Sequence, residues 1–342
     1  MREPAFWRRK PGLAARLLAP LSLAYGAVAG LRLRQRGRRA GMPVVCIGNF
    51  TVGGAGKTPT ALAVARMLAT AGERPVFLSR GYGGRLAGPV LVDPARHAAD
   101  DVGDEPLLLA RAAAAIVARA RVEGAALAAA AGAGVVVMDD GFQNPSLAKD
   151  FSVLVVDGQR GIGNGRVIPA GPLRAPLKAQ LARAHALVVV GTASGAADVV
   201  VAAARAQGIP VFAAWLRPDP GFVAALGGGR VLAFAGIGDP QKFFATLVDA
   251  GIPVAATRSF PDHHRYTKAE AQALCDDADR DGLILVTTEK DHVRLTGDEA
   301  LAELAAHAHA LPVALALEDE ETFRSLLLER IAEARRRAAE PS

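Results

Sequence analysis

Short runs of apolar, mostly β-branched residues alternate along the chain with longer segments whose apolar positions follow helical spacing. From residue 42 the run MPVVCIGN predicts a buried parallel strand, and TPTALAVARMLATAG predicts a helix that ends near Gly72. Further strands are predicted in the runs RPVFLS, which continues into the glycine-rich turn RGYGG, GVVVMDDGFQ, DFSVLVVDG, HALVVVG, GIPVFAAWLRP, RVLAFAGIGDP, IPVAATRSF, GLILVTTEKD and LPVALALE. Strands that alternate with helices are typical of α/β architecture with mainly parallel sheets.

The same pattern predicts the remaining helices and a division into domains. We expect helices over about 104–131, from about 240, from about 267 and over about 321–339. With 342 residues the chain is long enough for two domains, each with its own core. We expect an α/β domain over 41–195 and a second, smaller α/β domain over 196–342, with the boundary somewhere in 191–230.

The charges of the chain are concentrated before residue 41. Residues 1–40 hold ten arginines and lysines against one acid, Glu3, so the net charge of +6 arises in this segment and the rest of the chain is slightly acidic. Within the segment, Leu17 to Leu31 carry no charge; as a helix these residues would be about 22 Å long, short of a hydrocarbon core about 30 Å thick. We expect residues 1–40 to associate with a membrane surface, lying in or dipping into it.

Three alternatives remain for this segment: a secretory signal peptide, a basic arm that binds nucleic acid, and an ordinary core helix. The acidic balance of the rest of the chain disfavours a nucleic-acid partner. Cys46 and Cys275 lie far apart in the sequence, which argues against a disulfide framework or a zinc site.

The loop GNFTVGGAGKTPT has the parts of a phosphate-binding loop between a predicted strand and a predicted helix. Its glycines let backbone N–H groups converge on phosphate oxygens, its lysine reaches the outer phosphates, and its threonine hydroxyl suits Mg²⁺. Thr51 stands where the usual motif has its first glycine. We predict that nucleotide is bound by Thr51, Val52, Gly53, Gly54, Ala55, Gly56, Lys57 and Thr58.

Acidic and histidine residues follow other predicted strands. Asp139 and Asp140 end the apolar run VVVM, where a P-loop protein places the carboxylate that holds Mg²⁺. Asp104 and Glu105, in GDEP, read from the local pattern as a helix N-cap and a first-turn acid. FPDHHRY pairs Asp262 with His263 and His264 at a strand end, where a histidine–carboxylate pair has the chemistry of proton transfer.

Taken together and in this order, the motifs IGNFTVGGAGKTP, SRGYGG, GDEP, DDGFQ, GPLR, FPDHH and TTEKD resemble the tetraacyldisaccharide 4′-kinase family, the lipid A 4′-kinases of Gram-negative bacteria. The resemblance covers roughly residues 13–291, and the family's loop commonly has a serine or threonine at the position of Thr51. It implies a P-loop kinase domain over 41–195. The implied reaction moves the γ-phosphoryl group of ATP to the 4′-hydroxyl of a tetraacyldisaccharide 1-phosphate, a membrane lipid, with Mg²⁺ as cofactor. It also implies an enzyme on the cytoplasmic face of the bacterial inner membrane, peripheral or monotopic.

The resemblance also implies roles for particular residues. Lys57 would contact the β- and γ-phosphates, and the metal would be held by Thr58 with Asp139 or Asp140, aided by Glu105. Asp104 would accept the hydroxyl proton with the help of His263, in place of the N-cap role. Substrate contacts are expected from Tyr82, Gln143 and Arg174.

One position departs from the family pattern, and two other functions remain open. Where the family tends to have an acid after the arginine of GPLR, this chain has Ala175. The alternatives are a membrane-linked P-loop GTPase or ATPase of other function, and a kinase of a soluble small molecule. Against a GTPase, the chain contains no N-K-x-D run for guanine recognition. The pattern does not indicate the oligomeric state or the acyl-chain preference.

Overall fold

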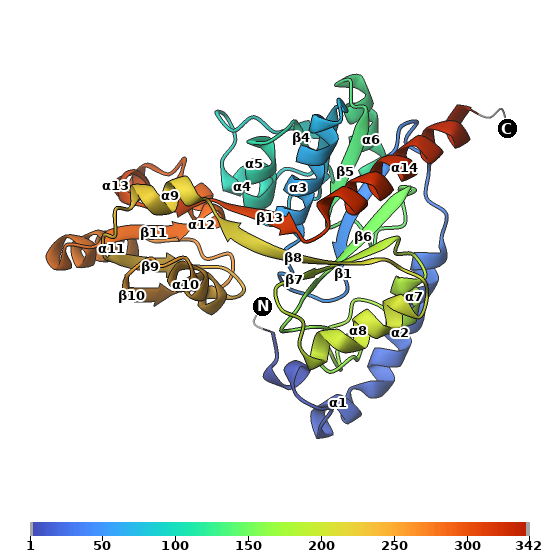
Figure 1. Cartoon of the computed structure of the whole chain (residues 1–342), viewed down its shortest axis with the longest axis horizontal. Helices are drawn as coiled ribbons and strands as arrows, with labels where there is room; N and C mark the ends of the chain where they lie inside the picture. Colours follow the sequence, from blue (N-terminus) through green and yellow to red (C-terminus); the bar gives the residue numbers. More distant parts are fainter. Residues whose placement is uncertain (1–2, 340–342) are drawn as a thin grey trace.

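The computed structural model describes residues 3–339 and contains two sheets flanked by helices (Figure 1). Residues 1–2 of the expected membrane segment and residues 340–342 of the expected second domain lie outside the described residues. The larger sheet has nine strands and the smaller has four. This confirms the mixed α/β architecture that the alternating pattern predicts.

The larger sheet has the order β13-β8-β7-β6-β1-β5-β2-β4-β3. Its strands are parallel except for the edge strands β3 and β13, which pair antiparallel with β4 and β8. Its strands are β1 (Val44–Asn49), β2 (Pro75–Ser79), β3 (Val90–Leu91), β4 (Ala115–Val117), β5 (Val135–Asp139), β6 (Phe151–Asp157), β7 (Ala186–Val190), β8 (Val211–Pro218) and β13 (Val313–Leu317). The central strands β1, β5, β6 and β7 are buried along their whole length, as their unbroken apolar runs predict.

The smaller sheet has the order β10-β9-β11-β12, and all its strands are parallel. Its strands are β9 (Val231–Ala235), β10 (Val254–Ser259), β11 (Ile284–Thr288) and β12 (His309–Leu311). Figure 1 places it at one end of the long axis, reached from the larger sheet through β8 and β13.

Helices connect the strands and cover both sheets. The longer ones are α2 (Ala19–Arg34), α3 (Lys57–Thr70), α6 (Arg121–Ala130), α8 (Gly195–Arg205), α10 (Pro240–Asp249), α11 (Lys268–Asp281) and α14 (Glu320–Ala339). The shorter ones are α1 (Leu13–Leu17), α4 (Ala99–Val102), α5 (Asp104–Ala110), α7 (Leu177–Leu181), α9 (Pro220–Ala225), α12 (Glu289–Leu295) and α13 (Ala302–His307). Two 3₁₀ turns complete the set, η1 (Ala5–Arg8) and η2 (Glu299–Leu301).

The helix expected over about 104–131 is wrong, because the segment is divided into α5, β4 and α6. The alanines between Arg111 and Ala118 favour a helix by themselves. However, Ala115–Val117 pair in parallel with Phe77–Ser79 of β2 and are fully buried, so pairing and packing in the sheet outweigh the local preference.

The two sheets do not divide the chain at residue 195. The smaller sheet begins at Val231 and ends at Leu311, whereas β8 and β13 on either side of it belong to the larger sheet. Helix α14 also returns to the larger sheet, since Phe323 packs against Phe151 and Phe212 with ring centroids 6.2 Å and 5.1 Å apart. The two-domain division stays a prediction, but its second part contributes two strands and a helix to the first.

The N-terminal segment forms η1, α1 and α2 beside α7 (Figure 1). Its apolar side chains are largely exposed: Leu13, Leu17, Leu21, Leu23, Tyr25, Val28 and Leu31. Gly26 and Gly30 instead face Pro176 at the start of α7, so only the other side of α2 is unpartnered by the described residues. Among residues 3–339, no helix has both the length and the apolar character that crossing a membrane requires.

Candidate active site

The P-loop joins the carboxyl end of β1 to the amino end of α3. Gly56 is the residue before the helix and has φ +90°, a left-handed conformation that favours glycine; an added Cβ there would also lie 3.1 Å from Val190. Asn49 holds the loop from the end of β1 by donating its side-chain amide to the carbonyl of Gly53 at 2.9 Å. The amino end of α3 therefore faces the region where phosphates would be bound.

The lysine and threonine of the loop are buried at the first turn of α3. The Lys57 Nζ atom lies 3.9 Å from Oδ1 of Asp140, and Thr58 is 4% exposed. The guanidinium of Arg174 donates to the same Asp140 oxygen at 2.8 Å and, through its Nε, to the carbonyl of Thr51 at 2.9 Å. Although burial alone would raise it, the pKa of Asp140 is lowered by the charges of Lys57 and Arg174.

Asp139 has a different environment from its neighbour. Its side chain is 1% exposed, and neither carboxylate oxygen has a hydrogen-bond partner among residues 3–339. Burial raises the pKa of Asp139 to about 7, and the negative charge of Glu105 contributes to the same shift. A buried carboxylate without a donor is destabilised in its charged form, and a divalent cation coordinated to oxygen would compensate for this. The donor set of Asp139 and the Thr58 hydroxyl thus fits Mg²⁺.

Asp104 is the first residue of α5 rather than its N-cap, which is Gly103 with φ +91°. Its Oδ1 accepts the backbone N–H of Glu105 at 2.9 Å. Its Oδ2 faces the Nε of Arg294 at 2.8 Å and the Nδ1 of His263 at 3.3 Å. Burial would raise the pKa of Asp104, but the His263 hydrogen bond and the charge of Arg294 hold it well below its usual range.

His263 comes from the loop after β10, so the Asp104–His263 pair joins the two sheets. The hydrogen bond to Asp104 raises the pKa of His263, against the effect of partial burial. The ring of Tyr82 lies beside the imidazole with centroids 5.4 Å apart, and the Nε2 atom is 4.0 Å from Asp262. The structure therefore brings three of the sequence-derived candidates together: Asp104, His263 and Tyr82.

Two cations of α12 in this site were missed by sequence reasoning. Lys290 donates to Oε1 of Glu105 at 2.7 Å, and Arg294 binds Asp104. They are four residues apart and so lie on one face of α12, opposite the adjacent acids of α5. Their helical spacing within TTEKDHVR was the available signal, but their partners are 185 and 190 residues away in the sequence.

These groups form one connected site. Helix α5 packs against α3, α12 and β2, and the pKa of Asp139 is raised by the charge of Glu105 and lowered by that of Lys290. Lys57 also acts on Asp139, so the P-loop borders the same space. The arrangement brings the glycine-rich loop, a buried carboxylate without a hydrogen-bond donor among residues 3–339 and an Asp–His pair together beside the larger sheet.

A groove of about 380 Å³ lies between the P-loop and the N-terminal helix α2. Its lining includes Val52, Gln143 and Arg174 together with Tyr25 and Arg32 of α2. Gln143 donates to the carbonyl of Asn49 at 2.8 Å, which fixes its side chain at the groove wall. The groove thus combines arginines with apolar side chains next to the candidate phosphate site.

Ala175 is fully buried, and its carbonyl accepts a hydrogen bond from the side-chain amide of Gln180 at 2.7 Å. Within the described residues, the carboxylates that remain near the loop are Asp139 at the end of β5, Asp140 directly after it, and Glu105, which is engaged by Lys290.

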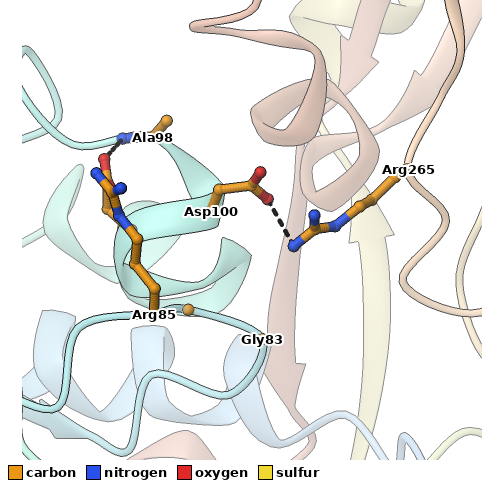
Figure 2. Close-up of a pocket in the computed structure, with 7 residues that line it drawn as sticks. Gly83, Arg85, Ala98, Asp100 and Arg265 are labelled. Atoms are coloured by element: carbon orange, nitrogen blue, oxygen red, sulfur yellow. Dashed lines mark hydrogen bonds and ion pairs between the residues drawn. The ribbon is translucent and has the colours of Figure 1, made fainter.

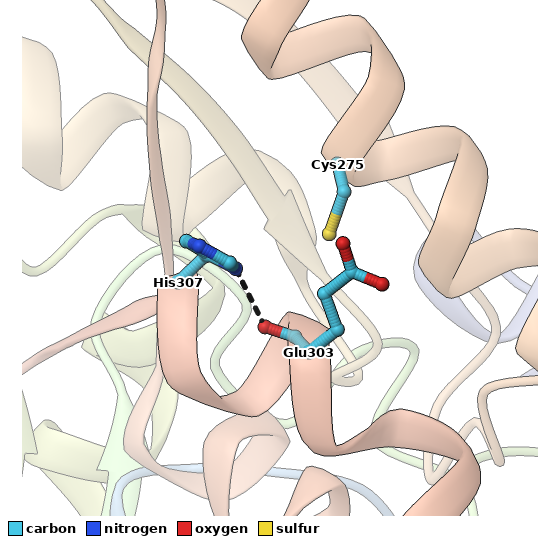
Figure 3. A group of neighbouring side chains, drawn as sticks. All are labelled: Cys275, Glu303 and His307. Atoms are coloured by element: carbon cyan, nitrogen blue, oxygen red, sulfur yellow. Dashed lines mark hydrogen bonds between the residues drawn. The ribbon is translucent and has the colours of Figure 1, made fainter.

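Two further features lie outside this group of residues. A hollow of about 510 Å³ opens between the loop at Gly83 and Arg85, helix α4, and Arg265, which is paired with Asp100 at 2.9 Å (Figure 2). Beside the smaller sheet, Cys275 on α11 and Glu303 and His307 on α13 place side-chain atoms that could bind a metal within 4.8 Å of one another (Figure 3). Burial and the charge of Glu303 raise the pKa of the Cys275 thiol, which favours its protonated form over a thiolate ligand.

Comparison with known proteins gives consistent matches over nearly the whole chain. The model of the Tetraacyldisaccharide-1-P 4'-kinase family matches residues 14–332. Proteins named tetraacyldisaccharide 4'-kinase from Nitrobacter winogradskyi and from a Bradyrhizobium strain are 57% and 58% identical, over 98% of this chain and 99% and 97% of their own lengths. The crystal structure of LpxK from Aquifex aeolicus in complex with ATP aligns with a TM-score of 0.72 at 28% identity, covering 93% of this chain and 99% of that one.

Proposed function

The chain belongs to the tetraacyldisaccharide-1-phosphate 4′-kinase family, and from this premise we propose how its site binds ATP and transfers phosphate to a lipid. As a member it is an ATP-dependent kinase that acts on a lipid A precursor in lipopolysaccharide biosynthesis. The observation that supports the proposed assignment of roles is the position of α5: its first residue, Asp104, pairs with His263 from the loop after β10, and the helix packs against α3, which follows the P-loop.

ATP would be bound at the amino end of α3. The backbone N–H groups of the loop and the Nζ of Lys57 would contact the β- and γ-phosphates, where positive charge stabilises the transferred group. Thr58 and Asp139 would hold Mg²⁺, with Asp140 kept in place by Lys57 and Arg174. The metal would supply neutralisation of the phosphate charge. Glu105 would support this site through Lys290 rather than as a ligand.

The Asp104–His263 pair would receive the proton. As the 4′-hydroxyl oxygen forms its bond to the γ-phosphorus, the bond from that phosphorus to the bridging oxygen breaks, and ADP leaves with the electron pair. The hydroxyl proton passes to the pair, in which Asp104 holds His263 through its Nδ1. In phosphoryl transfer such groups mainly orient the hydroxyl.

The lipid would reach the site along the N-terminal helices. The groove at Arg174 and Gln143 offers charged and polar contacts for a phosphorylated sugar, with Tyr82 nearer to His263. Exposed leucines on α1 and α2 would enter the membrane interface, and the arginines of residues 1–40 would bind anionic head groups. We propose peripheral or monotopic attachment at the cytoplasmic face of the inner membrane, where ATP is available.

The test uses full-length protein in detergent micelles with Mg·ATP and tetraacyldisaccharide 1-phosphate, and the lipid is read by mass spectrometry. We expect the lipid to gain one phosphoryl group in the wild type and none in Lys57→Ala. Lys178→Ala is the matched control, because Lys178 is an exposed lysine on α7. ATP hydrolysis without phosphorylated lipid would overturn the proposed acceptor and leave the nucleotide site in place.

A further inference from the structure

Arg294 lies on α12, and its side chain, only 8% exposed, contacts residues beside both sheets. Its Nη1 donates to the carbonyl of Gly236 at 2.7 Å and to Oδ1 of Asp291 at 2.9 Å. Its Nε donates to Oδ2 of Asp104 at 2.8 Å, and its Nη2 contacts the same oxygen. Each of its three nitrogens therefore has a partner, and the guanidinium plane has one orientation.

The contacts on the side of the smaller sheet are themselves fixed. Asp291 accepts from the Tyr266 hydroxyl at 3.0 Å, from the backbone N–H of Gly236 at 3.0 Å and from the Thr288 hydroxyl at 2.6 Å. Asp291 is fully buried. Arg294 is thus held by a closed polar network at the carboxyl ends of β9 and β11 before it reaches Asp104.

The contact on the side of the larger sheet determines which oxygen faces His263. Oδ2 of Asp104 receives Arg294 and the Nδ1 of His263 together, while Oδ1 receives the backbone N–H of Glu105. Without Arg294, the described contacts leave His263 as the only side chain directed at Oδ2, and the carboxylate could turn about its χ angles. Lys290 does not substitute, because its Nζ is paired with Glu105.

We propose that Arg294 is a positioning residue for phosphoryl transfer, which fixes the Asp104 carboxylate and thereby His263 in the orientation that receives the hydroxyl proton. The inference rests on the proposed function, since it concerns the same proton transfer. It adds that this orientation is determined by Gly236, directly after β9 of the smaller sheet, and by Asp291 on α12, although Asp104 begins α5, which packs on the larger sheet.

The test measures kcat and KM for lipid phosphorylation in full-length Arg294→Gln, Arg294→Lys and Asp104→Asn, and in the double variant Arg294→Gln/Asp104→Asn. We expect Arg294→Gln to lower kcat about 10- to 100-fold, and the KM for ATP to change less than about threefold, because the arginine does not contact the P-loop. Arg294→Lys keeps the charge but not the forked geometry, so it should recover part of the loss.

The double variant separates positioning from general support of the fold. If Arg294 acts through Asp104, removing it in the Asp104→Asn background should lower kcat less than about twofold further. A loss in the double variant equal to the product of the two single losses would overturn the proposal, as would an Arg294→Gln enzyme with wild-type kcat.

Arg335→Gln is the matched control. Arg335 lies on α14 and donates two hydrogen bonds to the carboxylate of Glu73, at 2.7 Å and 2.6 Å, so the substitution removes a comparable ion pair and should leave kcat unchanged. Should Arg294→Gln fail to fold, as judged by thermal unfolding and ATP binding, the same cycle is run with Arg294→Lys. Wild-type protein without lipid phosphorylation would refute the proposed function, whereas an active wild type with additive losses would refute only the role of Arg294.

Discussion

Asp139→Asn is expected to stabilise the metal-free protein at pH 8 and to abolish phosphoryl transfer. The folded chain raises the pKa of this carboxyl from an ordinary 3.8 to about 7. Between these values the folded state binds more protons than the unfolded state, so the stability contributed by this group falls as the pH rises. A shift of about three pKa units lowers the free energy of unfolding by about 4 kcal/mol at pH 8. At pH 5 the same shift lowers it by about 2 kcal/mol.

The amide of the variant removes this cost but introduces N–H groups without acceptors, which costs about 1–3 kcal/mol at either pH. We therefore expect the free energy of unfolding of the variant, relative to that of the wild type, to be about 2–3 kcal/mol higher at pH 8 than at pH 5. The assay is equilibrium unfolding in guanidinium chloride with EDTA at both pH values. In samples without EDTA, Mg·ATP should stabilise the wild type more than the variant, because mass action favours the state that binds the ligand and the variant lacks the carboxylate proposed to hold the metal.

Asp140→Asn is the adjacent control with the opposite sign. Lys57 and Arg174 outweigh burial and lower the pKa of Asp140, so its contribution is present above the ordinary carboxyl pKa and is lost as the pH falls. We expect Asp140→Asn to destabilise the protein at pH 8. Equal stability differences between Asp139→Asn and wild type at the two pH values would refute the reasoning from burial.

Three other outcomes are expected. Lys57→Ala should lower kcat by about 10³-fold or more, measured by lipid phosphorylation, because the phosphates lose a buried charge; retention of more than a tenth of the activity would contradict its role. The acidic limb of the kcat–pH profile should lie above the ordinary histidine pKa, because Asp104 raises the pKa of His263, and Asp104→Asn should move the remaining limb to lower pH; an unmoved limb would assign it to another group. Leu21→Glu/Leu23→Glu on α2 should abolish cosedimentation with anionic vesicles while leaving ATP binding intact, since both side chains are exposed; unchanged cosedimentation would contradict attachment through this helix.

The strand–loop–helix unit around Lys57 and the acids after β5 could be predicted from sequence because their signals are local. An apolar run, a glycine-rich turn and a helical pattern lie within thirty or so consecutive residues, and the structure has each element where the pattern predicts it. The same holds for the strands β6, β7, β9 and β11, whose apolar runs match their burial.

The features that could not be predicted depend on partners distant in the sequence. Strand β4 exists because β2 offers an edge to Ala115–Val117, and nothing within that alanine-rich segment indicates it. Lys290 falls in the run GLILVTTEKD, which predicts a strand, and no element was predicted over Arg294; in the structure both lie on α12, and the fold brings them to Glu105 and Asp104. Asp104 was assigned its role only through a resemblance, since its local pattern is that of a helix start.

The return of the chain to the larger sheet has a consequence for the order of folding. Strand β13 and helix α14 are synthesised after every strand of the smaller sheet, yet they complete the larger sheet. Until they arrive, one edge of β8 is unpaired, and the apolar surface around Phe151 and Phe212 lacks the cover that Phe323 provides. A nascent chain must keep this surface from aggregating while the whole smaller sheet is made. Truncation before α14 should therefore yield insoluble protein even though the P-loop and the Asp–His pair are all present.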